Sequence, residues 1–479
     1  EPVGADALVR FLPDWHGLPQ PRRGLDGLLD VIEQLQGAPL PASTLEHEIL
    51  PIRLPNYSPS QLDELCVQRE IIWRGFDATG TGDGRIGLFL TDDYLMLAPP
   101  SQTVDDPIAE SIRGLLKERT ALFFEELADA LRLFPNDILQ VLWQMVWAGE
   151  LTNDTLTPLR SLRAAQQNSG RRERRTDRRS GAGFRSRRRS HLPGSEGRWS
   201  LLPTVLQASG ESTTSVEADQ SPRPTVTERQ MAIATQLIER HGVLTKEMLA
   251  REEVAGGFAG LYPVLKAMEE AGRVRRGYFV AGLGAAQFAA PGAEDRLRSF
   301  RDPTDDAKPL ILAATDPASP WGNALSWPDS PEHSETGRPQ RVAGAKVIVF
   351  DGRLLGYLSR TRQSLLTFLS APIAEEVPSK NQRSEPKNSQ GDAPDPPAAT
   401  LAKALAKMAR PGRSVLLTKI DGQSADKSPL AAELLCAGFM STAQGLLHKG
   451  IPVSQADSLP SSDRSAAPGR RSGRGPRHA

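Results

Sequence analysis

The sequence predicts an α+β protein in which tandem winged-helix domains are followed by a β-rich α+β domain. Three helical patterns followed by a β-hairpin pattern occur within residues 5–100 and again within residues 224–292. Residues 308–450 consist mainly of short apolar runs separated by turn residues. Stretches rich in Arg, Ser, Gly and Pro separate these blocks, and we expect them to form disordered linkers and a disordered tail.

The first block, residues 5–100, is predicted to be a winged helix with a long wing. Apolar residues recur at helical spacing over 25–35, a second helix is expected over 43–50 with its end at Pro51, and a third begins at Ser58-Pro59. The period then changes to two over 71–76 and 85–90, and a Gly- and Asp-rich loop joins these two strands.

The second block, residues 106–162, repeats the three helices, and we expect its wing to be short or absent. Residues 163–222 are predicted to be a disordered linker, because ten arginines stand against two acids between Arg171 and Arg189. Within this linker only residues 197–202 have the pattern of a strand that could dock on the second block.

The third block, residues 224–292, is predicted to be a winged helix whose third helix begins at Gly256-Gly257 and ends at Gly272. In the block 308–450 we expect the following elements: strands over 310–314, 347–350, 354–359, 365–369, 415–420 and 445–448, helices over 400–409 and 429–437, and a low-complexity insert over 376–398. Residues 454–479 are predicted to be a disordered basic tail.

The composition is that of an ordinary water-soluble protein, with 58 basic residues balancing 58 acidic ones. Only two cysteines are present, Cys66 and Cys436, which excludes a disulfide framework and favours a reducing compartment. No apolar run approaches the ~18–20 residues that span a bilayer. We therefore expect a cytoplasmic, nucleoid-associated protein with no membrane contact. Because the chain begins at Glu1, we expect it to be a piece of a longer protein.

The wing of the third block carries the clearest candidates for nucleic-acid binding. Arg273, Arg275, Arg276 and Tyr278 suit phosphate contact and base stacking. Two further candidates are Lys266 in the preceding helix and Arg85 in the wing of the first block. Because Lys266 stands beside Glu269 and Glu270, we expect contacts with the DNA backbone rather than sequence-specific recognition in the major groove. The alternative is a winged helix that serves for protein packing.

The sequence gives little sign of a catalytic centre. No Gly-rich loop ends in Gly-Lys-Ser/Thr, no Gly-x-Ser-x-Gly motif is present, and the seven histidines lack the spacing of metal ligands. We therefore expect no cofactor and no metal in this chain. Asp316 follows an apolar strand beside Trp321 and Trp327, and an anion near aromatic rings would suit cleavage of a glycosidic bond. The favoured alternative is a structural loop in which Asp316 caps a turn.

Many short stretches resemble the region downstream of the motor core in large helicase-related (Lhr-type) helicases. The stretches that carry this resemblance are Arg10-Phe11-Leu12 with Trp15, Glu48-Ile49-Leu50-Pro51, Gly84-Arg85-Ile86, Trp147-Ala148-Gly149-Glu150-Leu151, Gly197-Arg198-Trp199-Ser200, Glu269-Glu270-Ala271-Gly272-Arg273-Val274-Arg275-Arg276-Gly277-Tyr278-Phe279, Gly284-Ala285-Ala286-Gln287-Phe288, and Ala314-Thr315-Asp316-Pro317 with Trp321-Gly322.

This resemblance implies a bacterial superfamily 2, ATP-dependent 3′-to-5′ DNA helicase linked to DNA repair, whose motor, with its ATP and Mg²⁺, lies N-terminal to these residues. It also implies a C-terminal region that is similar to helix-turn-helix alkylpurine-type DNA glycosylases, that can self-associate, and that has uracil-DNA glycosylase activity in some members. No catalytic motif of the family maps onto these residues, and Gln287 is a second candidate beside Asp316.

The sequence thus predicts a DNA-binding region that grips single-stranded or branched DNA for a motor supplied by the parent protein. Two alternatives stay open: a glycosylase for uracil or another modified base that needs neither metal nor ATP, and an oligomerisation module.

Overall fold

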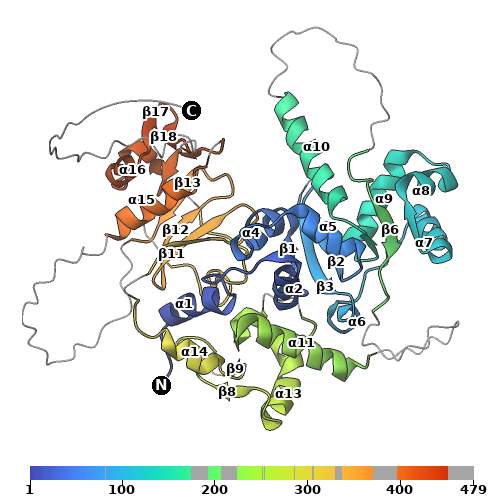
Figure 1. Ribbon diagram of the computed structural model, residues 1–479, viewed down its shortest axis with the longest axis horizontal. Helices are drawn as coiled ribbons and strands as arrows, with labels where there is room; N and C mark the ends of the chain where they lie inside the picture. Colours follow the sequence, from blue (N-terminus) through green and yellow to red (C-terminus); the bar gives the residue numbers. More distant parts are fainter. Residues whose placement is uncertain are drawn as a thin grey trace, which may run out of the picture.

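The computed structural model describes residues 1–173, 192–205, 224–328, 337–369 and 396–450, apart from residues 81, 251, 253, 285, 305, 306 and 411. The predicted α+β fold is confirmed, with winged helices and a mixed C-terminal sheet (Figure 1). The arginine run from 174 onward, the insert over 376–395 and the tail over 454–479 lie outside the described residues. In the described part of the chain, no helix is long and apolar enough to cross a membrane.

The first winged helix has three helical segments and a three-stranded sheet. Its elements are α2 (Gly24–Leu35), α3 (Ala42–Thr44), the π-helix η1 (Leu45–Ile49), α4 (Leu50–Arg53), α5 (Pro59–Val67), β1 (Leu40–Pro41), β2 (Ile71–Ala78) and β3 (Gly84–Leu90). The strand order is β1-β3-β2, with all pairs antiparallel. The short helix α6 (Tyr94–Leu97) follows the wing.

The prediction that Pro51 ends the second helix is wrong. The helical path continues through η1 into α4, in which Pro51 occupies the first turn and Arg53 is the last residue. Proline is tolerated there because the first N–H groups of a helix have no intrahelical acceptor, and the wider π turn before it accommodates the ring. The continuation carries Arg53 to a buried position between domains.

The second block has a wing of short strands, in line with the expectation that its wing would be short or absent. Its elements are α7 (Pro107–Arg119), β4 (Ala121–Phe123), α8 (Phe124–Leu131), α9 (Pro135–Trp147), β5 (Leu151–Asn153), α10 (Thr157–Glu173) and β6 (Arg198–Leu201). Strand β6 lies between β4 and β5, so the strand-like segment within the predicted linker does dock. Its Trp199 is fully buried against Trp143. The predicted start of the linker at 163 falls inside α10.

The third winged helix follows its prediction closely. It consists of α11 (Val226–His241), β7 (Val243–Leu244), α12 (Lys246–Leu249), α13 (Gly257–Glu270), β8 (Arg275–Gly277) and β9 (Gln287–Ala289), and α14 (Ala293–Ser299) follows. Thr245 caps α12 by accepting a hydrogen bond from the Met248 N–H, a role that threonine commonly has at the start of a helix. The sheet order is β7-β9-β8.

The C-terminal block contains a six-stranded sheet of order β10-β11-β12-β13-β15-β16 and a three-stranded sheet of order β14-β18-β17. The strands are β10 (Leu310–Ala313), β11 (Lys346–Phe350), β12 (Arg353–Leu358), β13 (Ser364–Thr367), β14 (Val415–Leu417), β15 (Lys419–Ile420), β16 (Gln423–Ser424), β17 (Met440–Thr442) and β18 (Gly445–His448). Helices α15 (Pro397–Lys407) and α16 (Ala431–Cys436) pack beside them. The single strand predicted over 415–420 is wrong, because its two halves join different sheets.

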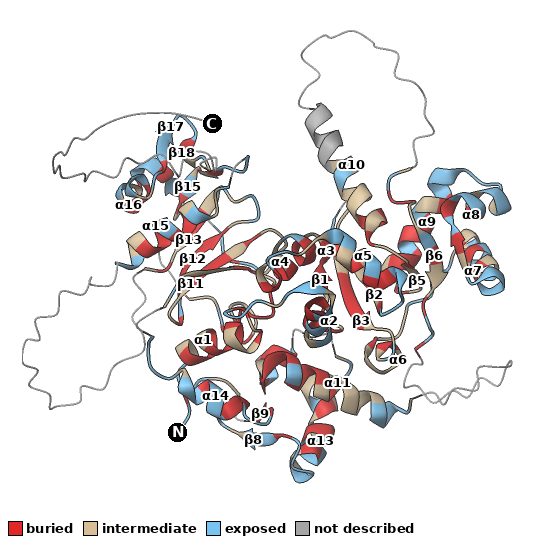
Figure 2. Ribbon diagram, in the orientation of Figure 1, coloured by how far each residue is buried: buried red, intermediate tan, exposed pale blue. Residues whose placement is uncertain are grey.

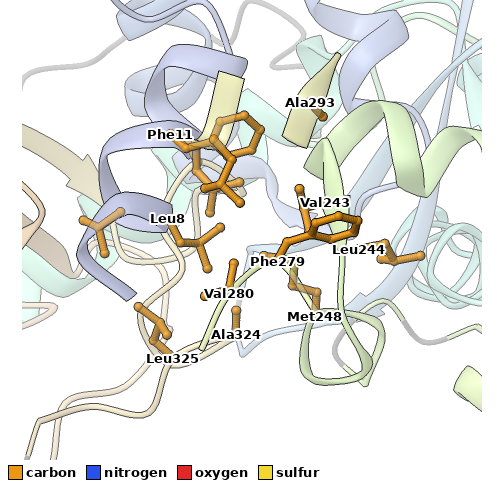
Figure 3. Close-up of a cluster of buried hydrophobic side chains, with 14 of the residues drawn as sticks. Leu8, Phe11, Val243, Leu244, Met248, Phe279, Val280, Ala293, Ala324 and Leu325 are labelled. Carbon is orange, nitrogen blue, oxygen red and sulfur yellow. The ribbon is translucent and has the colours of Figure 1, made fainter. Parts of the chain in front are cut away.

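The helix α1 (Ala5–Trp15) connects blocks that are distant in the sequence. Its Leu8 and Phe11 pack with Val243 and Phe279 of the third winged helix and with Leu325 of the C-terminal block (Figure 3). The buried residues of Figure 2 run along the inner faces of the elements that meet at this junction. The first and third winged helices and the C-terminal sheet are thus held as one packed body, in which residues from several blocks can share a site.

Candidate functional site

A cavity of about 1180 Å³ lies where the first winged helix, α10, the third winged helix and the C-terminal block meet. In Figure 1, α4 and β1 stand between α10 and the strands β11 and β12. Six arginines and two histidines among the described residues line this basic cavity, against three acids: Arg85, Arg163, Arg341, Arg360, Arg362, Arg413, His47 and His241, with Glu48, Asp83 and Glu252. Such an excess of guanidinium groups favours an anionic ligand.

The side chains of three of these arginines have no hydrogen-bond or ion-pair partner among the residues that the structure describes. They are Arg163, Arg360 and Arg413, and we call them the rim arginines. By contrast, Arg85 forms two hydrogen bonds with the Asp77 carboxylate, and Arg362 pairs with Glu48. Burial lowers the pKa of His47, and Arg163 and Arg413 lower it further, whereas Glu46 and Glu48 raise it, so this histidine lies within reach of the field of two rim arginines and two acids.

A loop after β10 forms one wall of the cavity, and a buried ion pair fixes it. Arg53 Nη2 lies 2.8 Å from Asp316 Oδ1, and Arg53 Nη1 lies 2.9 Å from Asp316 Oδ2. Both side chains are 1% exposed. Asp316 also accepts a hydrogen bond from the Ala318 N–H at 2.8 Å. This is the turn-capping arrangement that the sequence favoured for Asp316, and the buried carboxylate is fully occupied by its partners.

Arg341 holds the same loop from the other side. Its guanidinium donates hydrogen bonds to the carbonyl oxygens of Ser319, Trp321 and Asp316 at 2.8, 3.0 and 3.2 Å. Together with the Arg53–Asp316 pair, these bonds fix a segment that is not a helix or a strand. The loop therefore presents Thr315 and Asn323 to the cavity from a rigid support.

Three polar atoms on residues that line the cavity are buried and have no hydrogen-bond partner in the described part of the chain. They are His241 Nδ1, Thr315 Oγ1 and Asn323 Oδ1. The His241 side chain is only 1% exposed. We call these three residues the cavity floor. Buried polar groups are nearly always hydrogen-bonded, so these three unmet groups leave hydrogen-bonding capacity unused at the cavity wall.

Glu252 fixes the orientation of His241. Its Oε1 lies 2.7 Å from His241 Nε2, and its Oε2 pairs with Arg240. Burial would raise the pKa of Glu252, but the charges and hydrogen bonds of Arg240 and His241 outweigh burial and lower it to about 2. The carboxylate is thus ionised and accepts a hydrogen bond from Nε2 of the ring, which holds the ring in place and leaves Nδ1 as its unpaired nitrogen among the described residues.

The structure places the nucleic-acid-binding residues predicted from the sequence on two separate surfaces. Arg273, Arg275, Arg276, Tyr278 and Lys266 gather on the exposed wing and third helix of the third winged helix. Arg85 instead lines the basic cavity.

Most of the wing charges have acidic partners. Arg275 pairs with Glu294, Arg276 with Glu269, and Lys266 with Glu270. DNA contact by this wing stays a prediction. The other catalytic candidate, Gln287, is fully buried and bonds to the backbone of Phe279, Val280 and Gly284.

His16 lies behind the ion pair, and its ring accepts from Arg53 across 3.2 Å between Nδ1 and Nη2. Burial lowers the pKa of His16 well below its ordinary value, and Arg53 and neighbouring cations lower it further. Below about pH 6.5, His16 therefore binds a proton in the unfolded chain, whereas in the folded chain it stays neutral. As the pH falls through this window, the free energy of unfolding should decrease by up to about 1.4 kcal/mol per pH unit.

Replacing His16→Gln tests this prediction, because the glutamine carbonyl can still accept from Arg53 but does not titrate. Denaturant unfolding at pH 7.5 and at pH 5.5 should show a smaller loss of stability in the variant than in the wild type. Equal losses in the two proteins would contradict a role for His16.

The described residues contain no group of three or more His, Cys, Asp or Glu that could hold a metal ion. What the site offers is a set of cationic rim groups, a polar floor and a fixed loop between winged helices.

Comparison with known proteins shows which class of protein this arrangement belongs to. Residues 3–91 and 223–309 match the third and fourth winged-helix domains of large helicase-related proteins. These ranges coincide with the first and third winged helices of the structure. Two stretches of the chain thus match winged-helix domains of large helicase-related proteins.

Two curated relatives match almost the whole chain. The Lhr helicase/probable uracil glycosylase of Mycolicibacterium smegmatis is 37% identical over 468 residues, and the Lhr helicase/uracil glycosylase of Escherichia coli is 31% identical over 480 residues. Each alignment covers 93% of this chain and 28% of the relative. The chain is thus homologous to the C-terminal 28% of these proteins, outside their motor, which confirms the resemblance drawn from the sequence.

The solved structure of the Streptomyces sahachiroi DNA glycosylase AlkZ is similar to this chain over 79% of this chain and 93% of the AlkZ chain. The TM-score is 0.45 at 15% sequence identity.

Proposed function

We propose that this chain is a DNA glycosylase that removes uracil from DNA, with the basic cavity as its site. The observation that carries the proposal is the combination, in one cavity, of unpaired arginines at the rim and unmet polar groups at the floor. Arginines at a rim suit the phosphates of a strand, and a polar floor suits the edge of a base turned out of the stack. The relatives bear "uracil glycosylase" in their names, which supports the same assignment.

In the proposed reaction, water supplies the oxygen that bonds to C1′ of the deoxyribose, and the bond between C1′ and N1 of uracil breaks. The departing base takes the proton that the water loses, so the products are free uracil and an abasic site. The transition state carries positive charge on the sugar ring. Hydrolysis of this kind requires no ATP, and we propose that no metal takes part.

The sequence predicts a region that grips single-stranded or branched DNA for a motor. In this proposal, that DNA binding is the step that precedes base release. The rim arginines and the predicted wing residues are its two candidate surfaces. DNA is the proposed partner, and the motor of the parent protein and a second copy of the chain remain proposed partners as well.

Base release from a defined substrate tests the proposal. The chain is purified from a host that lacks its own uracil-DNA glycosylase and incubated, without ATP and with a metal chelator, with labelled single strands. The strands carry either uracil or thymine at one position and are then treated with alkali. We expect breaks at uracil only. Salt-sensitive binding without breaks would leave a DNA-gripping region, and a lack of binding would leave an oligomerisation module.

A further inference from the structure

We infer that the cavity floor is the subsite for the pyrimidine base, and that His241, Thr315 and Asn323 contact its hydrogen-bonding edge. The inference rests on the proposed function and goes beyond it, because it assigns the residues that recognise the base. None of the three is among the site residues predicted from the sequence, although Thr315 directly precedes the predicted candidate Asp316.

The first argument is the unmet hydrogen-bonding capacity of the floor. His241 Nδ1, Thr315 Oγ1 and Asn323 Oδ1 are buried and have no partner in the described part of the chain, although each can hydrogen-bond. The residues come from the end of α11 and from the loop after β10, which approach each other only in the folded protein. A ligand that offers both donors and acceptors would satisfy all three groups at once.

The second argument is chemical complementarity. The edge of uracil presents one N–H donor at N3 between the two acceptor oxygens O2 and O4. The Glu252 carboxylate accepts from His241 Nε2, which leaves His241 Nδ1 as the ring nitrogen that can bond to the base. The Thr315 hydroxyl can donate, and the Asn323 amide can do both. Together the three side chains can match the mixed donor and acceptor pattern of a pyrimidine edge.

The third argument is that the floor is held before a ligand arrives. Glu252 orients the His241 ring, and Arg53 and Arg341 fix the loop that carries Thr315 and Asn323. A site that recognises a base by hydrogen bonds needs this rigidity, because small displacements lose the bonds. On this assignment Asp316 is a positioning residue, which acts through the loop and does not touch the base.

Two substitutions test the inference, Thr315→Val, which removes the hydroxyl without changing the shape, and Asn323→Leu. We expect each to slow uracil release at least about tenfold, because the base or the floor is left with an unpaired polar group. The dissociation constant for a single strand without uracil should stay within about twofold, since the phosphates bind at the rim. Ser326→Ala is the matched control: Ser326 is exposed on the same loop region, does not line the cavity, and should release uracil at the wild-type rate.

A second measurement separates failure of the inference from failure of the proposed function. Free uracil at millimolar concentration should raise the Tm of the wild type and of Ser326→Ala, but not of Thr315→Val. If the wild type releases uracil from DNA and both floor variants match it, the inference is overturned and the proposed function stands. If the wild type releases none, yet free uracil raises its Tm through Thr315, the floor is supported and the proposed function is overturned. If neither effect occurs, both are overturned.

Discussion

Replacing Arg53 with methionine is expected to reduce the free energy of unfolding by about 3–5 kcal/mol. The substitution leaves the Asp316 carboxylate buried without its cationic partner, and removal of one member of a buried pair costs far more than the net contribution of the pair. The ordinary hydrogen bond from Ala318 cannot replace two charge-assisted bonds. Denaturant unfolding, followed by tryptophan fluorescence, measures the effect.

The double variant Arg53→Met with Asp316→Leu separates loss of the ion pair from loss of packing. Because no unpaired charge is left, most of the stability should return, and the double variant should be more stable than Arg53→Met alone. A single variant that loses less than about 1 kcal/mol would contradict the view that this pair fixes the loop. Uracil release by the double variant should stay low, since the loop loses its anchor to α4.

Reversing two rim charges, Arg360→Glu with Arg413→Glu, is expected to weaken binding of single-stranded DNA at least about tenfold near 0.1 M salt. Both guanidinium groups are exposed and have no partner among the described residues, so the folded state does not depend on them. Each lost phosphate contact should also reduce the slope of log K against log salt by about 0.7, hence by about 1.4 for the pair. Fluorescence anisotropy across a salt series measures both quantities.

Two matched variants change the net charge by the same amount. Arg275→Glu with Arg276→Glu alters the wing, whose arginines already pair with Glu294 and Glu269, and should have the smaller effect. Lys117→Glu with Arg119→Glu, at the end of α7 and away from both surfaces, should leave the affinity close to that of the wild type. A large loss in the wing variant and a small one in the rim variant would place the DNA on the wing instead.

Local patterns in the sequence predicted most of the fold. Helical spacing over 25–35, the start of a helix at Ser58-Pro59, and the change to period two over 71–76 and 85–90 are all local signals, and the structure confirms them. The Asp351-Gly352 turn between β11 and β12 is another, since both residues adopt the positive φ angles of a tight hairpin turn. These features depend on neighbours a few residues apart, which a sequence displays directly.

What the sequence could not predict depends on contacts between distant residues. Strand β6 completes the second wing only because Trp199 finds a buried place beside Trp143, and the 415–420 segment divides because two sheets compete for it. The cavity floor likewise depends on contacts between residues that are distant in the sequence. Arg53 and Asp316 are 263 positions apart, and no local pattern marks Asn323 as a partner of His241. Only Arg85, among the predicted binding residues, lines the cavity.

Photo-crosslinking with 5-iodouracil tests the central claim most directly, because it reports where the base lies. A single strand with 5-iodouracil at one position is irradiated with the chain, and the crosslinked peptide is identified by mass spectrometry. We predict crosslinks within the peptide that carries Thr315, Trp321 and Asn323, abolished by the rim variant and kept by the wing variant. Crosslinks confined to the wing around Tyr278, with none in the loop after β10, would contradict the assignment of the cavity as the site.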